Sequence, residues 1–428
     1  MRFLAAHFAV ILLALLSYLR SSQALCFNGQ CKLRQVCFRN TDCAAGLFCS
    51  TCVADGDLLR RCHRYKTTNV AEIRGGLPFN KYAWLTTHNS FAKVGAPSHT
   101  GEPIVTFENQ EDSILDQLNN GVRGLMLDMY DFLGNVWLCH SFGGTCYNFT
   151  AFEPAVNTLK SIEGFLSTNP SEIVTIFIED YVRSSNGLTK VFQEAGLKKY
   201  WFPVSRMPKN GENWPTITEM VAKNQRLLVF TSNRTKEASE GIAYDWKYVN
   251  ENQYGNGGMK TGECPKRGES ATLNATSRSL VLMNFFRDNP VQVEACKYNS
   301  APLQGMLPVC YAAAGNRWPN FLAVDFYKRS DGGGTFDAID TLNAGIICGC
   351  SDINICKLKL PFGVCNTTSL SVPTSSNQPS SSIEPPKALA DQLNATSQGN
   401  LDTKQPSAII VLVLTMMLYI GLSTCHNY

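Results

Sequence analysis

Short apolar runs rich in β-branched and aromatic residues recur between residues 82 and 327 of this 428-residue chain. Continuous apolarity of this kind is typical of strands that are covered on both faces. The six predicted strands are YAWLTT (82–87), VRGLMLDM (122–129), EIVTIFIED (172–180), RLLVFTS (226–232), SLVLMNFF (279–286) and FLAVDFY (321–327). Between them, SILDQLNNG (113–121) ends at a glycine and AVNTLKSIEGFLSTNP (155–170) ends at a proline, which predicts helices. Strand and helix therefore alternate along the chain.

Such alternation predicts parallel βα units, arranged either as an open doubly wound sheet or as a (β/α) barrel. The first strand is not followed by a glycine-rich phosphate fingerprint, which disfavours the dinucleotide-binding type of open sheet. Nearly every predicted strand ends with a polar group, and the carboxyl ends of barrel strands are where barrel enzymes carry their chemistry. These polar residues are His88, Asn89, Asp128, Glu179, Asp180, Ser232, Asn233, Asn284 and Asp325. We predict an α/β fold, a distorted (β/α) TIM-type barrel.

A second histidine follows another short apolar run, in VWLCHSFGGTC (136–146). Here Cys139 and Cys146 bracket a glycine-containing loop, and a disulfide between them would fix His140. A lone histidine beside an apolar run is more often structural than functional. Two histidines at one barrel mouth, together with carboxylates, favour a functional site in which one imidazole is a general base and the other a general acid.

The two ends of the chain carry targeting patterns. Residues 1–24 combine Arg2, an apolar run and the small-residue triplet SQA, which predicts a secretory signal peptide. The apolar run at 408–422 is short for a membrane span and lacks a basic flank. With the polar spacer and small residues upstream, it predicts a GPI-attachment propeptide at 398–428, joined through Ser397 or, alternatively, Asn394. The mature protein is expected on the outer face of the plasma membrane.

Composition agrees with export. Sixteen of the seventeen cysteines lie between residues 26 and 365, and seven of them crowd into residues 26–62. This predicts a disulfide-held module at 25–62, with one bridge to the main domain because seven is odd. The pair Cys49 and Cys52 is interpreted as structural and not as a zinc site.

A Ser/Thr/Pro stalk is predicted at 366–397, which leaves 63–365 as the barrel domain. The predicted N-glycosylation sites are Asn148, Asn233, Asn274, Asn366 and Asn394. The formal charge of +3, without basic runs, does not indicate a nucleic-acid partner, and none is expected.

Five motifs in order, LTTHNSF, GVRGLMLDMYD, LCHS, IVTIFIED and FLAVDFY, resemble those of the X domain of phosphatidylinositol-specific phospholipase C. The cysteine-rich start, the GPI-like end and ENQYG (251–255) resemble the plant cell-surface members. The resemblance implies that His88 is the base that helps the inositol 2-hydroxyl attack phosphorus. It implies that His140 is the acid that protonates the leaving oxygen and that Asp325 orients a histidine.

The resemblance also implies a metal site, because Asn89, Asp128 and Glu179 match three oxygen ligands of the family's calcium. Met126 stands where calcium-dependent members have a fourth, acidic ligand, so bound Ca²⁺ is expected to be weak or absent. Metal-independent bacterial members have an arginine where this chain has Asp128. The implied substrate is an inositol phospholipid or a GPI-type lipid, and Arg234 is a weak candidate for contacting its phosphate.

Two other functions remain open at this point. The chain could be an inactive GPI-anchored protein that keeps the barrel for binding. A glycerophosphodiester phosphodiesterase ranks third, because the first strand ends in His-Asn and not in His-Arg. Arg123 is interpreted as a buried ion-pair partner that points away from the mouth.

Overall fold

The computed structural model describes residues 26–70, 75–356 and 360–365. The predicted signal peptide, stalk and propeptide lie outside these residues, as do Asn366, Asn394 and Ser397. Within the described part of the chain, no helix has the length and apolar character that crossing a membrane requires.

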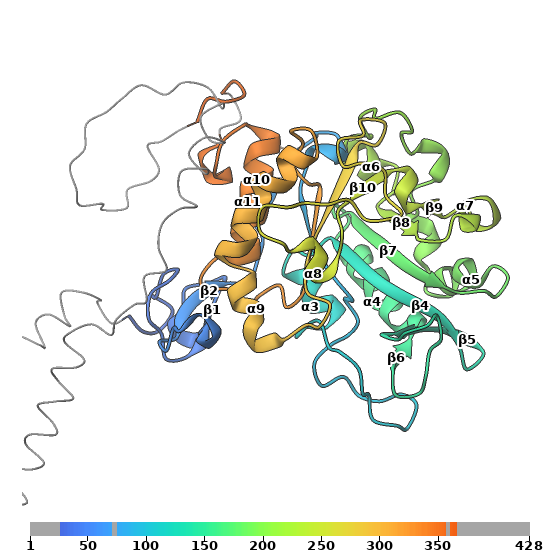
Figure 1. The fold of residues 1–428 in the computed structure, drawn as a ribbon, viewed down its shortest axis with the longest axis horizontal. Coiled ribbons are helices and arrows are strands. Elements are labelled where there is room, and N and C mark those ends of the chain that lie inside the picture. Colours follow the sequence, from blue (N-terminus) through green and yellow to red (C-terminus); the bar gives the residue numbers. More distant parts are fainter. Residues whose placement is uncertain (1–25, 71–74, 357–359, 366–428) are drawn as a thin grey trace, which may run out of the picture. The chain divides into compact units, whose positions relative to one another are not determined.

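Eight parallel strands form a curled sheet, which Figure 1 shows among its helices. Along the sheet they are β10 (Val249–Glu251), β11 (Leu280–Phe285), β12 (Phe321–Val324), β3 (Trp84–Thr87), β4 (Gly124–Phe132), β7 (Val174–Tyr181), β8 (Leu227–Thr231) and β9 (Ala243–Tyr244). The first of these strands in sequence, β3, pairs with the last, β12, so the sheet curls. Over the described residues no ladder joins β9 to β10, and the barrel stays open there as a half-barrel. The predicted distorted barrel is confirmed, and all six predicted strands are present.

Helices connect the strands and cover the outside of the sheet, with α9, α10 and α11 on the left of the strands in Figure 1 and α5 and α7 on the right. The α-helices are α3 (Ile114–Asn119), α4 (Ala155–Thr168), α5 (Gly187–Glu194), α6 (Ile217–Ala222), α7 (Thr235–Glu240), α8 (Gly255–Gly258), α9 (Gln292–Tyr298), α10 (Ala301–Ala313) and α11 (Gly334–Ile347). The 3₁₀ turns are η1 (Asn40–Asp42), η2 (Val53–Asp55), η3 (Phe79–Lys81), η4 (Leu197–Tyr200), η5 (Val204–Arg206), η6 (Asp245–Lys247) and η7 (Ile353–Ile355). Both helices predicted from sequence are present, and Ser113 caps α3 by accepting a hydrogen bond from the Asp116 amide.

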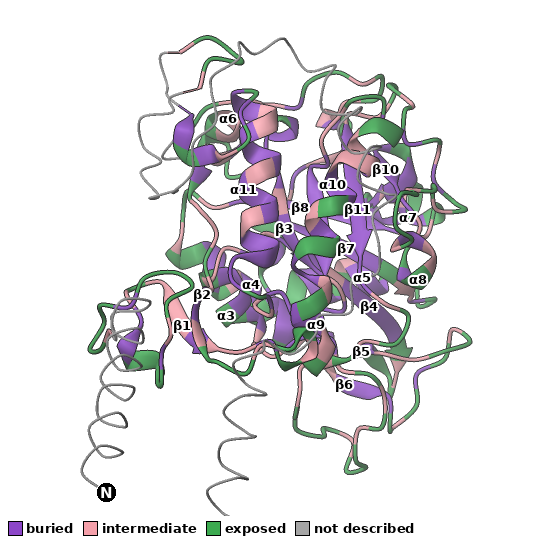
Figure 2. Ribbon diagram, turned by 60° about the vertical axis from the view of Figure 1, so that its left-hand side comes forward, coloured by how far each residue is buried: buried purple, intermediate pink, exposed green. Residues whose placement is uncertain are grey.

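The sheet is buried on both faces, which explains why its strands are apolar without alternation (Figure 2). Every residue of β8, β11 and β12 is buried. Inside the curl, Phe177 lies against Phe230 and Phe321 with ring centroids 5.3 and 5.0 Å away. Arg123 donates to Glu172 over 2.7 Å, as predicted for a structural ion-pair partner.

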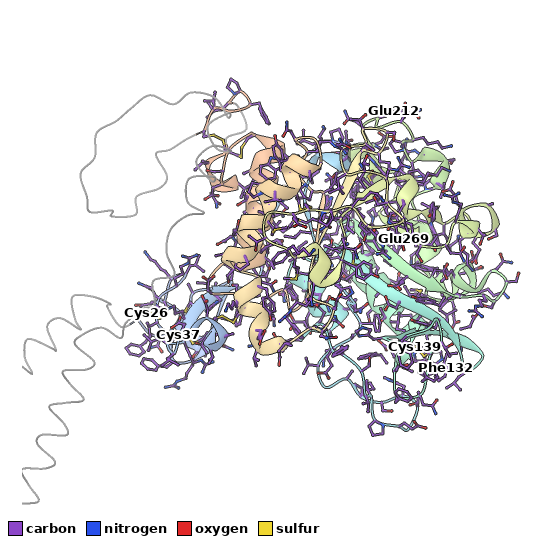
Figure 3. All side chains as sticks on the ribbon, viewed as in Figure 1. Cys26, Cys37, Phe132, Cys139, Glu212 and Glu269 are labelled. Atoms are coloured by element: carbon purple, nitrogen blue, oxygen red, sulfur yellow. A yellow bond between two sulfur atoms is a disulfide. The ribbon has the colours of Figure 1, made fainter. Side chains whose placement is uncertain are left out.

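A short antiparallel extension was not predicted. Strand β4 has nine residues and runs beyond its parallel neighbour β3, and its free part pairs with β5 (Asn135–Cys139), which pairs with β6 (Ala151–Pro154). The loop from β5 to β6 is closed by the disulfide Cys139–Cys146. Figure 3 labels Cys139 and Phe132 in this extension. His140 is thereby carried on a cross-linked hairpin loop.

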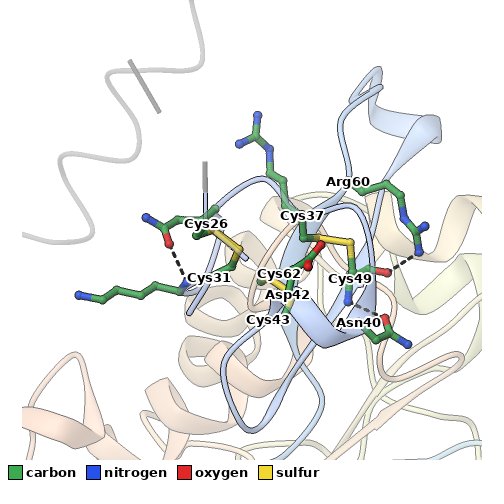
Figure 4. Close-up of a disulfide and its surroundings, with 12 residues drawn as sticks. Cys26, Cys31, Cys37, Asn40, Asp42, Cys43, Cys49, Arg60 and Cys62 are labelled. Atoms are coloured by element: carbon green, nitrogen blue, oxygen red, sulfur yellow. Dashed lines mark hydrogen bonds between the residues drawn. A yellow bond between two sulfur atoms is a disulfide. The ribbon is translucent and has the colours of Figure 1, made fainter. Parts of the chain in front are cut away.

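The N-terminal module is held by disulfides (Figure 4). It contains one antiparallel pair, β1 (Leu47–Ser50) with β2 (Arg61–Arg64), and three internal bridges, Cys26–Cys31, Cys37–Cys49 and Cys43–Cys62. The predicted bridge to the main domain joins Cys52 to Cys296 of α9. Cys49 and Cys52 therefore have separate partners, and neither thiol is free for zinc.

The remaining bridges lie in the main domain: Cys264–Cys310, Cys348–Cys356 and Cys350–Cys365. All sixteen cysteines of residues 26–365 are thus paired, as the even count predicted. Because all of these bridges join cysteines within residues 26–365, we expect this part to fold without the residues that follow.

Candidate active site

Two strand ends bend sharply at the mouth of the half-barrel. Asn89, directly after His88, has φ +40°, and Phe326, directly after Asp325, has φ +45°. Non-glycine residues rarely adopt this left-handed backbone, and it concentrates at functional sites. Because β3 and β12 are paired neighbours in register, the two bends lie side by side and bring His88 to Asp325.

His88 is fixed from two directions. Its Nδ1 lies 3.0 Å from Oδ1 of Asp325, whose carboxylate also accepts from Asn109 Nδ2 over 3.0 Å. Its ring stacks on Phe286 at the end of β11, with centroids 3.6 Å apart and planes 6° apart. Since Nδ1 is occupied by the carboxylate, Nε2 remains for chemistry in the cavity.

His140 comes from the disulfide-closed loop and is fixed in a similar way. Its Nδ1 donates to the carbonyl oxygen of Phe107 over 2.8 Å. Its Nε2 lies 3.3 Å from the side-chain oxygen of Asn89, in the amide orientation that satisfies both groups. Burial lowers the pKa of His140 below its usual value, and nearby His88 lowers it further. Burial therefore disfavours the charged form of His140, which makes the protonated ring a stronger proton donor.

An acidic pair lies beside the histidines, at equivalent positions of the paired strands β4 and β7. In the same amide orientation, the side-chain nitrogen of Asn89 lies 3.0 and 3.2 Å from the two carboxylate oxygens of Asp128. Burial, together with the charge of Glu179, raises the pKa of Asp128 well above its usual range. A cation shared by the two carboxylates would relieve this repulsion. Met126 packs against the aromatic interior and supplies no oxygen ligand.

A half-buried arginine that the sequence analysis missed faces the acidic pair. Arg267 binds Glu251 through Nη1 over 3.2 Å, and its guanidinium lies 4.9 Å from the ring centroid of Trp246 and 4.7 Å from that of Tyr254. Its charge lowers the pKa of Asp128, although burial and Glu179 outweigh that effect. The motif ENQYG, which contains Glu251 and Tyr254, was the available signal for this part of the site.

These groups line one cavity of about 250 Å³. It contains five of the predicted site residues, His88, Asn89, Asp128, His140 and Glu179, and it also contains Arg267, Glu251 and Asp245. Asp325 does not line this cavity, and it contacts His88 through Nδ1 of the ring. Arg234 does not line this cavity. Its guanidinium lies 5.1 Å from the ring centroid of Tyr244, in a separate surface hollow.

The sequence model of the family described as PI-PLC X 1 matches residues 80–343, more than half of the chain. The chain belongs to the PI-PLC X-domain family. A PI-PLC X domain-containing protein of Arabidopsis thaliana is 53% identical over 366 residues, covering 86% of this chain and 85% of the relative. An uncharacterized secreted protein of Arthroderma benhamiae is 26% identical over 295 residues, covering 62% of this chain and 64% of the relative. Among solved structures, the phosphatidylinositol-specific phospholipase C of Listeria monocytogenes aligns with a TM-score of 0.41 and 19% identity, covering 60% of this chain and 92% of that one.

Three predicted glycosylation sites of this PI-PLC X-domain protein fall on described residues. Asn274 is exposed, while Asn148 and Asn233 are half-buried. The side-chain oxygen of Asn233 accepts from the Thr235 amide and hydroxyl over 3.1 and 2.8 Å, and Asn148 donates to Glu102 over 2.9 Å. None of the three lines the cavity.

Proposed function

We propose that this PI-PLC X-domain protein is a phosphoric diester hydrolase that cleaves an inositol phospholipid by two-histidine acid–base catalysis. One observation carries the proposal. His88 and His140 line the same cavity, and each is held through Nδ1. Nε2 of His88 is left for the substrate, and Nε2 of His140 lies 3.3 Å from the side-chain oxygen of Asn89. Paired imidazoles of this kind suit general acid–base catalysis near neutral pH.

In the proposed reaction, His88 Nε2 takes the proton of the inositol 2-hydroxyl while that oxygen attacks phosphorus. The bond from phosphorus to the diacylglycerol oxygen breaks, and His140 Nε2 gives its proton to that oxygen. The products are a cyclic inositol phosphate and diacylglycerol. Asp325 stabilises the imidazolium that forms on His88, and the lowered pKa of His140 makes it an effective acid.

The negative charge that develops on the phosphate requires compensation in the cavity. Arg267 is a cation already present there, held by Glu251 and by two aromatic rings. Asn89, Asp128 and Glu179 are the hard oxygen donors that would hold a Ca²⁺ ion, whose charge would further stabilise the phosphate. Because Met126 contributes no fourth oxygen ligand, we expect this Ca²⁺ to bind weakly.

We further propose that the protein acts outside the cell. The eight disulfides, the predicted signal peptide and the secreted fungal relative support export. A GPI anchor at Ser397, or at Asn394, would place the enzyme on the outer leaflet. There its substrates would be inositol phospholipids or GPI-type glycolipids.

The test is a hydrolysis assay on secreted residues 25–365 with phosphatidylinositol, measuring cyclic inositol phosphate with calcium or with chelator. We expect His88→Ala and His140→Ala each to lower the rate by about 10²–10⁴-fold, the usual contribution of a general acid or base. His99→Ala is the matched control, because His99 donates to the carbonyl of Phe152 and lies outside the cavity. If the folded protein releases no product from several inositol lipids, it is a binding protein, as Met126 in the metal site would suggest.

A further inference from the structure

One irregular segment contacts both histidines of the candidate site. This linking segment, residues 106–110 (TFENQ), lies between β3 and α3 and belongs to no helix or strand. Phe107 is exposed, whereas Asn109 and Gln110 are completely buried. Because buried polar side chains need hydrogen-bond partners, the contacts of these two amides show what the segment holds in place.

At its carboxyl end the linking segment holds the proposed base and its partner. Nδ2 of Asn109 donates to Oδ1 of Asp325 over 3.0 Å and lies 3.3 Å from Nδ1 of His88. The backbone carbonyl of Asn109 accepts from the Phe326 amide over 2.8 Å. Nε2 of Gln110 donates to the carbonyl of His88 over 2.8 Å and to that of the last residue of β12 over 3.1 Å. Two adjacent residues therefore tie the ends of β3 and β12 together.

At its amino end the same segment holds the proposed acid. The hydroxyl of Thr106 donates to the carbonyl of His140 over 2.7 Å, and the carbonyl of Phe107 accepts from Nδ1 of that ring over 2.8 Å. Only Glu108 separates Phe107 from Asn109, and consecutive Cα atoms are about 3.8 Å apart. One short piece of chain therefore contacts the acid and the base, and links their positions.

We propose that Asn109 is a positioning residue and that the linking segment holds the base and the acid in one arrangement. Asn109 acts through Asp325, because its N–H fixes the carboxylate oxygen to which Nδ1 of His88 donates. With the proton of the neutral ring held on Nδ1, Nε2 is left unprotonated and can accept the substrate proton. The inference rests on the proposed function, which gives the two imidazoles their roles.

The first measurement needs no turnover. Secreted residues 25–365 contain the histidines His63, His88, His99 and His140, and nitrogen-15 NMR of the labelled imidazoles shows which ring nitrogen carries the proton. At about pH 8.5 an ordinary imidazole is neutral, and comparison with His88→Ala assigns the His88 signals. We expect one form in the parent, protonated on Nδ1, and a mixture of both forms in Asn109→Leu, which has a similar size but no donor.

The matched control is Asn343→Leu, which removes another buried amide from the opposite end of β3. Nδ2 of Asn343 donates to the carbonyl of Ala83 over 3.0 Å, and its Oδ1 accepts from the Ala83 amide over 2.8 Å. Both substitutions are expected to cost stability, but the control should keep the single form of His88. If Asn109→Leu is not secreted, Asn109→Ser, which removes the amide without adding bulk, replaces it.

The second measurement is release of cyclic inositol phosphate from phosphatidylinositol. Asn109 does not line the cavity, so Asn109→Leu should lower kcat by at least about tenfold, the effect of one hydrogen bond to a charged group, and leave KM within about twofold. Thr106→Val, which removes the donor to the carbonyl of His140, should lower kcat as well. Because one segment holds both rings, the double variant should lose less than the product of the two single losses.

A parent in which His88 already shows both forms, or an Asn109→Leu variant that keeps one form, would overturn the proposal. Equal kcat per folded molecule in Asn109→Leu and Asn343→Leu would do the same, and losses that multiply in the double variant would refute the link between base and acid. Failure of the proposed function gives a different result. If the parent hydrolyses nothing but Asn109→Leu changes the form of His88, the hold of Asn109 on His88 stands and the proposed enzyme is refuted.

Discussion

The contact between Asp325 and His88 offers the sharpest test of the proposed catalytic arrangement. In Asp325→Asn the shape of the side chain is kept while its charge is lost. The ring of His88 stays stacked on Phe286, so the change acts on charge and tautomer more than on position. What disappears is the charged partner at 3.0 Å that stabilises the imidazolium once His88 has taken the substrate proton.

The size of the effect follows from the hydrogen bond that is weakened. A hydrogen bond to a charged group contributes about 1.5–3 kcal/mol. Each 1.36 kcal/mol in the barrier is about tenfold in rate, so kcat should fall about 10- to 150-fold. The loss should be smaller than that of His88→Ala, which also removes the base itself.

The assay is release of cyclic inositol phosphate from phosphatidylinositol under saturating substrate. Asp180→Asn is the matched control, because Asp180 is a half-buried carboxylate near a strand end that accepts from the Val182 amide and the Thr231 hydroxyl, away from the histidines. A variant Asp325→Asn as active as Asp180→Asn would refute the role assigned to Asp325. A loss equal to that of His88→Ala would also contradict the calculation.

Three further predictions concern the charges of the cavity. The pKa of His140 is lowered from 6.5, and its acid form is lost as pH rises through that pKa. The fall of kcat/KM at high pH should therefore be centred below pH 6.5, and a fall centred above this value would exclude His140 as the acid. The folded-state pKa of Asp128 is raised, so its stabilising effect is present below its unfolded value near 3.8 and lost as pH rises. In chelator, the Tm of Asp128→Asn should therefore exceed that of the parent by more at pH 7 than at pH 4, and a constant difference would contradict this. Arg267→Gln should tighten Ca²⁺ binding several-fold in calorimetry by removing a competing cation, whereas Arg234→Gln, outside the cavity, should not; equal affinities would show that Arg267 does not act on the acidic pair.

Sequence pattern was sufficient for the long, buried parts of the fold. Strands such as β7 and β8 are covered on both faces, so their apolar runs are continuous and easily found. The edge strands β9 and β10 have only two and three residues, too few to show any period. The β5–β6 extension was missed because its strands have only five and four residues, and their antiparallel pairing depends on β4 running beyond the end of β3.

Some residues of the candidate site could likewise be predicted from sequence, and others could not. His88, Asp128 and Glu179 could be predicted because each directly follows a recognisable apolar run. Arg267 could not, since it lies in an irregular segment after β10 and reaches the cavity only through its contacts with Glu251 and two aromatic rings. The stacking of Phe286 on His88 likewise depends on the relative positions of β11 and β3, which no local pattern encodes.

The open side of the half-barrel bears on how the protein avoids aggregation. An incompletely closed barrel leaves two sheet edges, and an exposed edge is a template for pairing with another chain. Here both edges are too short to offer more than a few backbone groups, and Ala243, Val249 and Asn250 are fully buried. The side-chain Nδ2 of Asn250 also donates to the carbonyls of Leu273 and Ala275, which holds the following loop over β10. The barrel can therefore stay open beside the cavity without exposing a strand edge with which another molecule could pair.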